Sequence, residues 1–305
     1  MIHFKRLMPE DRSNYQTLLF LDGTRGCEYS FANINMWGRQ RIAFLHDRAI
    51  LFSQYDRVSL YPYPVGTADV RPALEAIITD ASKRGIPCRL ASMNQTDCQM
   101  VEALYPGKFQ FHIDRDHFDY VYTIDDLAEL AGKRYQSKRN FANRFASNYP
   151  DHQCLPIDEA TIPAIQTMLE QWFSDRQTIS PDSDFLLERV ALNRAFANMQ
   201  ALGLEGLAIM IDGKCIAMTM GSQLSEDTFD IHFEKALDEA AYPAINQAFA
   251  AHLREKYPEV KWLDREDDMG LEGLRKAKLS YNPDMMVEKY WARLWEDEDD
   301  CCISK

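Results

Sequence analysis

The chain has 305 residues, of which 46% are hydrophobic and 11% aromatic, a composition that excludes wholesale disorder and suits one large domain or two medium ones. Its formal net charge of −13 opposes non-specific binding to nucleic acid or anionic lipid, so either partner would need a local basic patch. The seven cysteines include no CxxC pair, no apolar run approaches the roughly 20 residues of a membrane span, and the N-terminus lacks a secretory signal, which together indicate a reduced, cytoplasmic protein without stable membrane insertion.

The first half of the chain alternates strand-like and helix-like segments. Apolar runs flank His46-Asp47-Arg48, which we place at the turn of a hairpin. Leu74, Ile77 and Ala81 recur at helical spacing, and Gly85 marks the end of that helix. The expected elements are a helix or turn leading into a strand (28–45), a β-hairpin (42–54), a strand (58–66), a helix (69–85), a strand (87–93), a helix (95–107) and a pair of strands (109–124).

A similar order begins again from Gln153. Asp212-Gly213 lies between two apolar runs and is a strong signal for a type I′ hairpin turn, and Pro243 suits the first turn of a helix. The elements expected after a helix over 132–149 are a strand (154–158), two helices (160–176 and 184–203), a hairpin (204–224), a strand (228–237), a helix (242–258), a strand (260–264), a helix (271–281) and a final strand (283–294). Because each half repeats one order of elements, we predict an α/β protein with mixed sheets and two copies of one architecture.

A basic segment, GKRYQSKRNFANRF over 132–145, stands out in this acidic chain. It carries five cations, the last of them Arg144, and no acid occurs over 131–149. On a helical wheel two of the cations fall within an apolar stripe, so their side chains must extend to solvent, pair, or line a cleft. Two interpretations stay open: an amphipathic helix whose basic stems cover the edge of a core, or a site for a phosphate-bearing ligand. The binding residues in the second case are Lys133, Arg134, Lys138, Arg139 and Asn140.

A second polar segment, REDDMGLEGLRKAKLSY over 265–281, follows an expected strand, and Gly270 permits a sharp turn into a helix. Capping and the helix dipole favour acids before a helix, which accounts for Asp267 and Asp268. The alternative is a reaction site, because charged groups at the end of a strand in an α/β sheet often contact ligands. The candidate catalytic groups are Glu266, Asp268 and Tyr281, the last of which could equally be a packed aromatic, and the candidate binding groups are Arg265, Arg275, Lys276 and Lys278.

Other sequence signals are weak. His112, Asp114, Asp116 and His117 have metal-capable side chains, but strand alternation puts His117 on the opposite face, so we expect no metal site. No GxGxxG or P-loop sequence occurs, and no GxSxG sequence supports a serine nucleophile. Dinucleotide, ATP and serine-hydrolase chemistry therefore lack their usual marks.

The basic segment and the segment over 265–284 together resemble a family of bacterial proteins grouped with the C-terminal domain of phosphatidylglycerol lysyltransferase. The resemblance spans nearly the full chain. It implies two GNAT-like (acetyltransferase-type) domains in tandem, similar in architecture to the Fem-type aminoacyl-tRNA-dependent transferases. The expected organisation is an N-terminal GNAT-like domain (1–131), a basic connecting helix (132–152), a C-terminal GNAT-like domain (153–295) and a disordered acidic tail (296–305).

Two departures from related proteins bear on the substrates. GNAT domains that use acetyl-CoA hold its pyrophosphate on a Gly-rich turn, whereas the matching place here, 237–243, has two acids, no glycine, and Pro243, which lacks an amide N–H. This disfavours acetyl-CoA as the donor. The lysyltransferases that act on lipid carry a large membrane portion, so the lack of a membrane segment in this sequence argues against a lipid acceptor.

The leading hypothesis is an acyl or aminoacyl transferase with a cleft between its two lobes. An aminoacyl-tRNA or another phosphate-bearing donor would bind through residues 133–144. An amine or hydroxyl acceptor would lie near Glu266 and Asp268, one of which would receive its proton. We expect no tightly bound cofactor, with acyl-CoA or aminoacyl-tRNA as the donor substrate. The alternatives are an acyl-CoA-dependent N-acyltransferase and a non-catalytic module that binds an anion.

Overall fold

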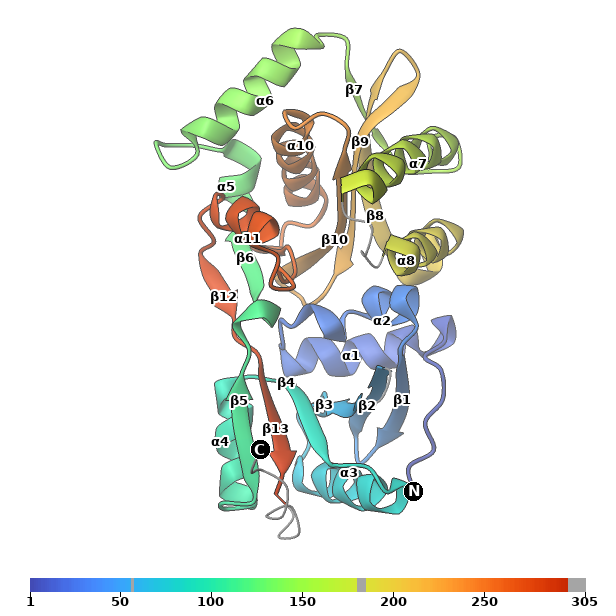
Figure 1. The fold of residues 1–305 in the computed structure, drawn as a ribbon, viewed down its shortest axis with the longest axis vertical. Coiled ribbons are helices and arrows are strands. Elements are labelled where there is room, and N and C mark those ends of the chain that lie inside the picture. The colour runs from blue at the N-terminus through green and yellow to red at the C-terminus, as the bar shows by residue number, and fades with distance from the viewer. Residues whose placement is uncertain (56–57, 180–184, 296–305) are drawn as a thin grey trace.

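Figure 1 shows the computed structural model of the chain, which describes residues 1–55, 58–179 and 185–295. The acidic tail expected over 296–305 lies outside the described residues. The strands form two mixed sheets, one in each lobe of an elongated molecule, and helices cover both sheets. The α/β class with mixed sheets is thereby confirmed.

The first sheet has six strands, in the order β1 (Gln40–Leu45), β2 (Arg48–Tyr55), β3 (Val58–Pro62), β4 (Arg89–Met93), β13 (Tyr290–Leu294) and β5 (Phe109–Ile113). Apolar side chains of α3 (Arg71–Arg84) and α4 (Gln95–Leu104) pack on one face. Those of α1 (Arg12–Asp22) and α2 (Phe31–Trp37) pack on the other. His46 and Asp47, each with φ of 55°, form the turn of the expected hairpin.

The second sheet has seven strands, in the order β12 (Met285–Val287), β6 (Asp119–Thr123), β11 (Trp262–Asp264), β10 (Thr228–Ala236), β9 (Lys214–Gln223), β8 (Leu204–Ile211) and β7 (Gln153–Pro156). One face packs against α5 (Ile124–Glu129), α6 (Gln136–Asn148) and α10 (Ala241–Lys256). The other packs against α7 (Ile162–Ile179), α8 (Phe185–Ala197) and α9 (Met199–Leu202). The last helix, α11 (Glu272–Leu279), lies against β6 (Figure 1).

The two sheets share one design and exchange one strand each. Among the pairs of neighbouring strands described, β3–β4 and β10–β11 are parallel and the others are antiparallel. β6 follows β5 in the chain but enters the second sheet between β11 and β12, whereas β13 follows β12 but enters the first sheet between β4 and β5. The expectation that 109–124 forms a strand pair is therefore wrong, since β5 and β6 belong to different sheets. Sheet membership also crosses the boundaries that the sequence suggested for the two domains.

The seam between the lobes contains a continuous apolar core. Phe31 and Met36 of α2 belong to the same buried cluster as Leu192 and Ala195 of α8 and Met220 of β9. Three short 3-10 helices complete the connections: η1 (Pro9–Asp11), η2 (Cys27–Tyr29) and η3 (Arg115–His117). Because η2 and α2 lie over the end of the second sheet, N-terminal residues reach the ends of β10 and β11.

Candidate active site

The site begins where β10 and β11 part. These parallel strands are paired up to Asp230 and Asp264, after which β11 ends and β10 continues to Ala236. A register shift between Ile231 and Phe233 places His232 at a β-bulge, a device that re-aims a side chain. The loop after β11 therefore faces the middle of β10 at the carboxyl end of β11, and ligands often bind at such strand ends in α/β proteins.

Glu266 lies at the rim of this place. Its backbone has φ of 57°, and its amide donates to Asp264 Oδ1 at 2.7 Å. Its Oε1 accepts a hydrogen bond from Asn33 Nδ2 at 3.1 Å and lies 3.0 Å from His232 Nδ1. The side chain is 22% exposed, so Glu266 connects a buried cluster to solvent.

His232 connects Glu266 to the interior. Its Nε2 lies 2.8 Å from Ser222 Oγ, which is 3.2 Å from Ser30 Oγ of the first lobe. Its Nδ1 lies 3.3 Å from Asp230 Oδ2. Burial raises the pKa of Asp230 well above its usual range, and the neighbouring charges of Glu266 and Asp264 raise it further. Burial acts on the pKa of Asp264 in the same direction.

The sequence analysis missed Asp230 and His232. The signal was a polar side chain at every second position of an otherwise apolar strand, TFDIHFEKA over 228–236, where Glu234 completes the set. Alternation puts Asp230 and His232 on the face opposite Phe229 and Ile231, and a buried strand has no ordinary reason to carry both there. The bulge ends this alternation, because Phe233 packs in the core of the other face, so Glu234 does not share the face of Asp230. That pattern would have pointed to a polar site next to the segment over 265–268.

A second buried cluster joins the strands that cross between the lobes. Lys289, just before β13, donates to Asp119 Oδ1 at the start of β6 over 2.8 Å and lies 2.7 Å from Glu28 Oε2. The amide of Cys27 donates to Asp119 Oδ2 at 3.0 Å. Burial raises the pKa of Asp119 to about 6, although Lys289 acts in the opposite direction. The sequence analysis missed this cluster as well, because its members are far apart in the chain.

Arg265 and Lys278 are engaged with the protein itself. The Lys278 ammonium donates to three main-chain oxygens, those of Arg265, Glu266 and Asp267. Arg265 forms an ion pair with Glu234 at 2.6 Å. Both cations thus hold the loop that presents Glu266. A phosphate that bound Lys278 would have to displace the main-chain oxygens, and one that paired with Arg265 would compete with Glu234.

Asp268 is buried among donors. It accepts two hydrogen bonds of 2.8 Å from Arg275 and one of 2.9 Å from the amide of Gly270, and it also contacts the Tyr120 hydroxyl. The bonds from Arg275 hold the pKa of Asp268 well below its usual range. A carboxylate that stays ionised and is surrounded by donors is a weak proton acceptor. Arg275 also pairs with Asp116 at 2.5 Å.

The basic helix α6 meets the second polar segment at Tyr281. Lys138 Nζ lies 4.1 Å from the centre of the Tyr281 ring, and the Arg265 guanidinium lies 4.6 Å from the same centre. Burial, and then Arg265, lower the pKa of Lys138 to about 8. Tyr281 is 4% exposed and lies in the core under α10, with its hydroxyl 3.4 Å from Asn246 Nδ2. The two cationic segments therefore meet at one aromatic ring.

Three other predicted binding residues are engaged with protein groups. Arg134 pairs with Asp126 and lies 3.7 Å from Asp284, and Arg139 donates to the main-chain oxygens of Leu130 and Gly132. Lys276 pairs with Glu272 at 2.7 Å on the exposed side of α11.

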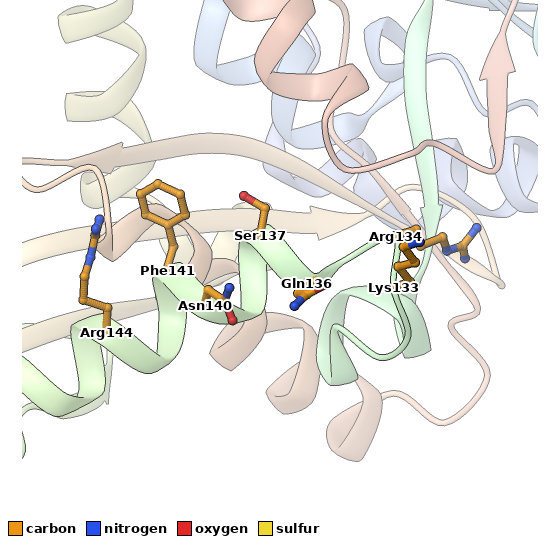
Figure 2. A pocket seen from close by; sticks show the side chains of 7 residues that line it. All are labelled: Lys133, Arg134, Gln136, Ser137, Asn140, Phe141 and Arg144. Carbon is orange, nitrogen blue, oxygen red and sulfur yellow. The ribbon is translucent and has the colours of Figure 1, made fainter.

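A depression of about 560 Å³ runs along α6 and the loop before it. Figure 2 shows the side chains that line it, which are Lys133, Arg134, Gln136, Ser137, Asn140, Phe141 and Arg144. It combines cations, amides, a hydroxyl and an aromatic ring, all suited to a nucleic acid backbone and its bases. The depression lies on the outside of the second lobe, whereas apolar side chains occupy the seam in which a cleft was expected.

No helix within the described residues is long and apolar enough to cross a membrane.

Comparison with known proteins identifies the relatives of this chain. Residues 21–293 match the family described as phosphatidylglycerol lysyltransferase, C-terminal. A conserved protein of unknown function from Bacteroides thetaiotaomicron VPI-5482 is 35% identical, with a TM-score of 0.91 that covers 97% of this chain and 100% of that one. L-PGS from Bacillus licheniformis has a TM-score of 0.66 at 13% identity over 95% and 93% of the two chains. FemX has a TM-score of 0.60 at 9% identity over 95% and 97%.

An uncharacterised protein from Mycoplasmoides gallisepticum is 24% identical over 182 residues, which are 58% of this chain. The match spans only about half the length of that relative, 56%. The structural likenesses confirm a tandem GNAT-like fold. The match over residues 21–293 confirms the resemblance that the two motifs had indicated.

Proposed function

The chain belongs to the family described as phosphatidylglycerol lysyltransferase, C-terminal, and we propose that it transfers an aminoacyl group from aminoacyl-tRNA to an amine or hydroxyl acceptor. Family and fold point to a GNAT-like acyl or aminoacyl transferase. The donor, the acceptor and the roles of individual residues are the parts that we add. Each follows from the chemistry of the side chains described above.

The observation that carries the proposal is the shared contact on Tyr281. Lys138 of α6 and Arg265 of the loop after β11 lie on the same ring, at 4.1 Å and 4.6 Å. Glu266 follows Arg265 directly in the chain, so the acid at the rim lies one residue from this aromatic contact. A donor that binds along α6 would bring its reactive end toward Glu266.

The donor surface consists of two open cations, Lys133 in the loop before α6 and Arg144 on α6, together with their neighbours. Lys133, Asn140 and Arg144 line the depression without an acidic partner among the described contacts, and Phe141 lies among them. Phosphates are bound by such cations, and an unpaired base can stack on an aromatic side chain. A polyanion would thus bind locally to a protein whose overall charge of −13 repels it.

Glu266 is the group we assign to proton transfer. The acceptor nitrogen attacks the ester carbonyl carbon of the donor, so that a C–N bond forms and the C–O bond to the ribose breaks. The proton leaves the nitrogen for the Glu266 carboxylate and passes from there to the departing ribose oxygen. Oε1 is occupied by Asn33 and His232, whereas Oε2 makes no hydrogen bond with the residues that the structure describes. Because the donor ester is already activated, positioning supplies much of the rate.

The N-terminus of α10 argues against acyl-CoA as the donor. Asp238 Oδ1 already accepts a hydrogen bond from the amide of Ala240 at 2.8 Å, where a CoA pyrophosphate would need free amides. Pro243, in the first turn of α10, offers no amide N–H. A carboxylate at this place also repels phosphate, so tRNA is the better candidate.

The donor surface can be tested by binding unfractionated tRNA to the full chain, with fluorescence anisotropy as the readout at several salt concentrations. We expect Lys133→Glu with Arg144→Glu to weaken binding at least about tenfold, and to lower the salt slope by about one for each phosphate that is no longer bound. Lys83→Glu is the matched control, because Lys83 is an exposed cation on α3 of the other lobe. The donor assignment fails if wild type does not bind tRNA, or if the double variant binds as tightly as the control.

A further inference from the structure

Three side chains at the parting of β10 and β11 converge on one point. One oxygen each of Asp230 and Glu266 and one ring nitrogen of His232 lie within 4.8 Å of one another. We propose that these three side chains bind a divalent transition-metal ion, Zn²⁺ or Mn²⁺. The site shares Glu266 with the proposed transfer reaction, but it stands on separate observations and does not depend on that reaction.

The spacing of the donor atoms suits a metal ion. His232 Nδ1 lies 3.0 Å from Glu266 Oε1 and 3.3 Å from Asp230 Oδ2. Ligands bonded to zinc at about 2.0–2.2 Å in a tetrahedron lie roughly 3.3 Å apart, and in an octahedron slightly closer. Both separations from His232 match this geometry, and the two carboxylate oxygens lie within 4.8 Å of each other.

Unsatisfied acceptors give independent support. Within the described parts of the chain, neither oxygen of Asp230 accepts a hydrogen bond, and the same holds for Asp264 Oδ2 and Asn33 Oδ1. Asp230 and Asp264 are 0% exposed and lie opposite each other on paired strands. Buried acceptors without donors are costly, and two adjacent buried carboxylates repel each other. A divalent cation in this site would coordinate one Asp230 oxygen, and its charge would offset the repulsion between the two carboxylates.

The surroundings of His232 also resemble those of a metal ligand. Its Nε2 is held 2.8 Å from Ser222 Oγ, which in turn lies 3.2 Å from Ser30 Oγ. A ligating histidine usually bonds through its second ring nitrogen to such a partner, which fixes its orientation. With the proton on Nε2, the Nδ1 lone pair faces two carboxylate oxygens, an arrangement that a cation between them stabilises. The positive charge of the nearby Lys289 is already matched by Asp119 and Glu28.

The ligand set selects the kind of ion. One imidazole favours Zn²⁺ and its neighbours over Mg²⁺ or Ca²⁺, and two carboxylates keep Mn²⁺ as a candidate. The sequence analysis expected no metal site, because it considered only the residues over 112–117, where strand alternation separates His117 from the others. Here Asp230 and His232 come from β10 and Glu266 from the loop after β11, so the fold brings the set together.

Metal binding can be measured on the full chain after chelator treatment and dialysis. Bound Zn²⁺ or Mn²⁺ is counted by equilibrium dialysis and elemental analysis. We expect one ion per chain, with affinity lowered at least about tenfold in His232→Ala and in Asp230→Asn. Asp230→Asn keeps nearly the native shape and stands in if His232→Ala does not fold. Ser222→Ala, which removes only the orienting hydroxyl, should weaken binding by a smaller factor.

His117→Ala is the matched control, because it removes an exposed imidazole 3.1 Å from Asp267 and leaves the buried set intact. It should bind metal as wild type does. The proposal is overturned if wild type binds neither ion, or if His232→Ala and Asp230→Asn bind as tightly as wild type. Either result would leave His232 in contact with the two acids without an ion between them. No donor or acceptor is present in this experiment, so its failure would not bear on tRNA binding or on transfer.

Discussion

At the scale of single residues, the cations of the two polar segments have different tasks. Lys278 binds three main-chain oxygens, and Arg139 binds two others. Lys133 and Arg144 line the open depression instead. Mutating a cation of the first kind should unfold a loop, whereas mutating one of the second kind should alter binding alone. For this reason the donor surface is best tested at Lys133 and Arg144.

Asp268 should act on stability. We expect Asp268→Asn to lower the free energy of unfolding by about 1–3 kcal/mol at pH 7, because Arg275 and the Gly270 amide lose a charged acceptor. Since the folded state holds the pKa of Asp268 below its usual value, its contribution is present above about pH 4 and is lost as the pH falls. Urea denaturation between about pH 3 and 7 measures both effects.

Asp116→Asn provides the comparison for this prediction. It removes the other acidic partner of Arg275. The Asp116 side chain is 53% exposed, and exposed ion pairs contribute only about 0–1 kcal/mol to the free energy of unfolding. If Asp268→Asn is as stable as Asp116→Asn at every pH, the assigned role of Asp268 is wrong.

Part of the candidate site was readable from the sequence because charge is conspicuous. The cations over 133–144 and the acids over 266–268 stand out in any linear reading, and in the structure the contact between Lys138 and Tyr281 joins the two segments. Which of those charges are neutralised was not readable, because the partners of Arg139 and Lys278 are main-chain oxygens. Asp230 and His232 gave a signal in the polar positions of their strand, but the partner of Asp230 on the neighbouring strand was not readable.

At the scale of elements, α6 combines a core-facing side with an exposed basic side. Ala142 and Phe145 are buried, and Phe145 and Tyr149 pack in the same core as α10. Both interpretations of the basic segment thus describe parts of one helix: some cations cover or brace the fold, and others border a depression. Lys138 lies between these groups, and its pKa makes its charge sensitive to pH.

Lys138 should make polyanion binding depend on pH. Because burial lowers its pKa to about 8, its positive charge is lost as the pH rises through that value. We expect tRNA affinity to fall between about pH 7 and 9 in wild type, and this step to disappear in Lys138→Arg, since arginine stays charged. Anisotropy titrations at the two pH values measure the step, and Lys133→Arg should keep it. An unchanged step in Lys138→Arg would rule out Lys138 as its source.

The same shift has a consequence for folding. Over the interval from about 8 to about 10.4, the unfolded chain binds more protons at Lys138 than the folded chain does. The contribution of Lys138 to stability therefore rises with pH in this interval, opposite in sign to its effect on binding.

Helices and strands were predictable from local patterns, whereas sheet membership was not. The hairpin at Asp212-Gly213 and the helix over 71–84 follow from turn residues and apolar spacing. The partner of β6 depends on contacts across more than a hundred residues, since β6 pairs with β11 and β12. Local alternation over 109–124 contains no information about that choice, so the predicted pairing of β5 with β6 was wrong.

At the scale of the whole molecule, the exchange of β6 and β13 links the two lobes. Each sheet contains a strand that the other half of the chain supplies, and the apolar cluster of α2, α8 and β9 is common to both. Unfolding of either lobe would therefore remove a strand from the sheet of the other lobe and expose part of the shared apolar core. The shared strands and core therefore fix the position of the α6 surface relative to Glu266.

We expect the chain to unfold in one transition. Urea denaturation followed by tryptophan fluorescence and by far-ultraviolet circular dichroism should give the same midpoint, and removal of β13 by ending the chain at residue 288 should lower the stability of both lobes. Two separate transitions in the intact chain would show that the lobes fold independently, contrary to the shared core.

The most direct test of the transferase account is the discharge of aminoacyl-tRNA under single-turnover conditions, with excess full-length protein and a panel of amine and hydroxyl acceptors. The account predicts loss of the ester bond with matching aminoacylation of an acceptor. It also predicts that Glu266→Gln, which keeps the contact to Asn33, slows this step by about a hundredfold or more while tRNA affinity stays unchanged. Bound tRNA that keeps its aminoacyl group with every acceptor, or full-speed transfer by Glu266→Gln, would contradict it.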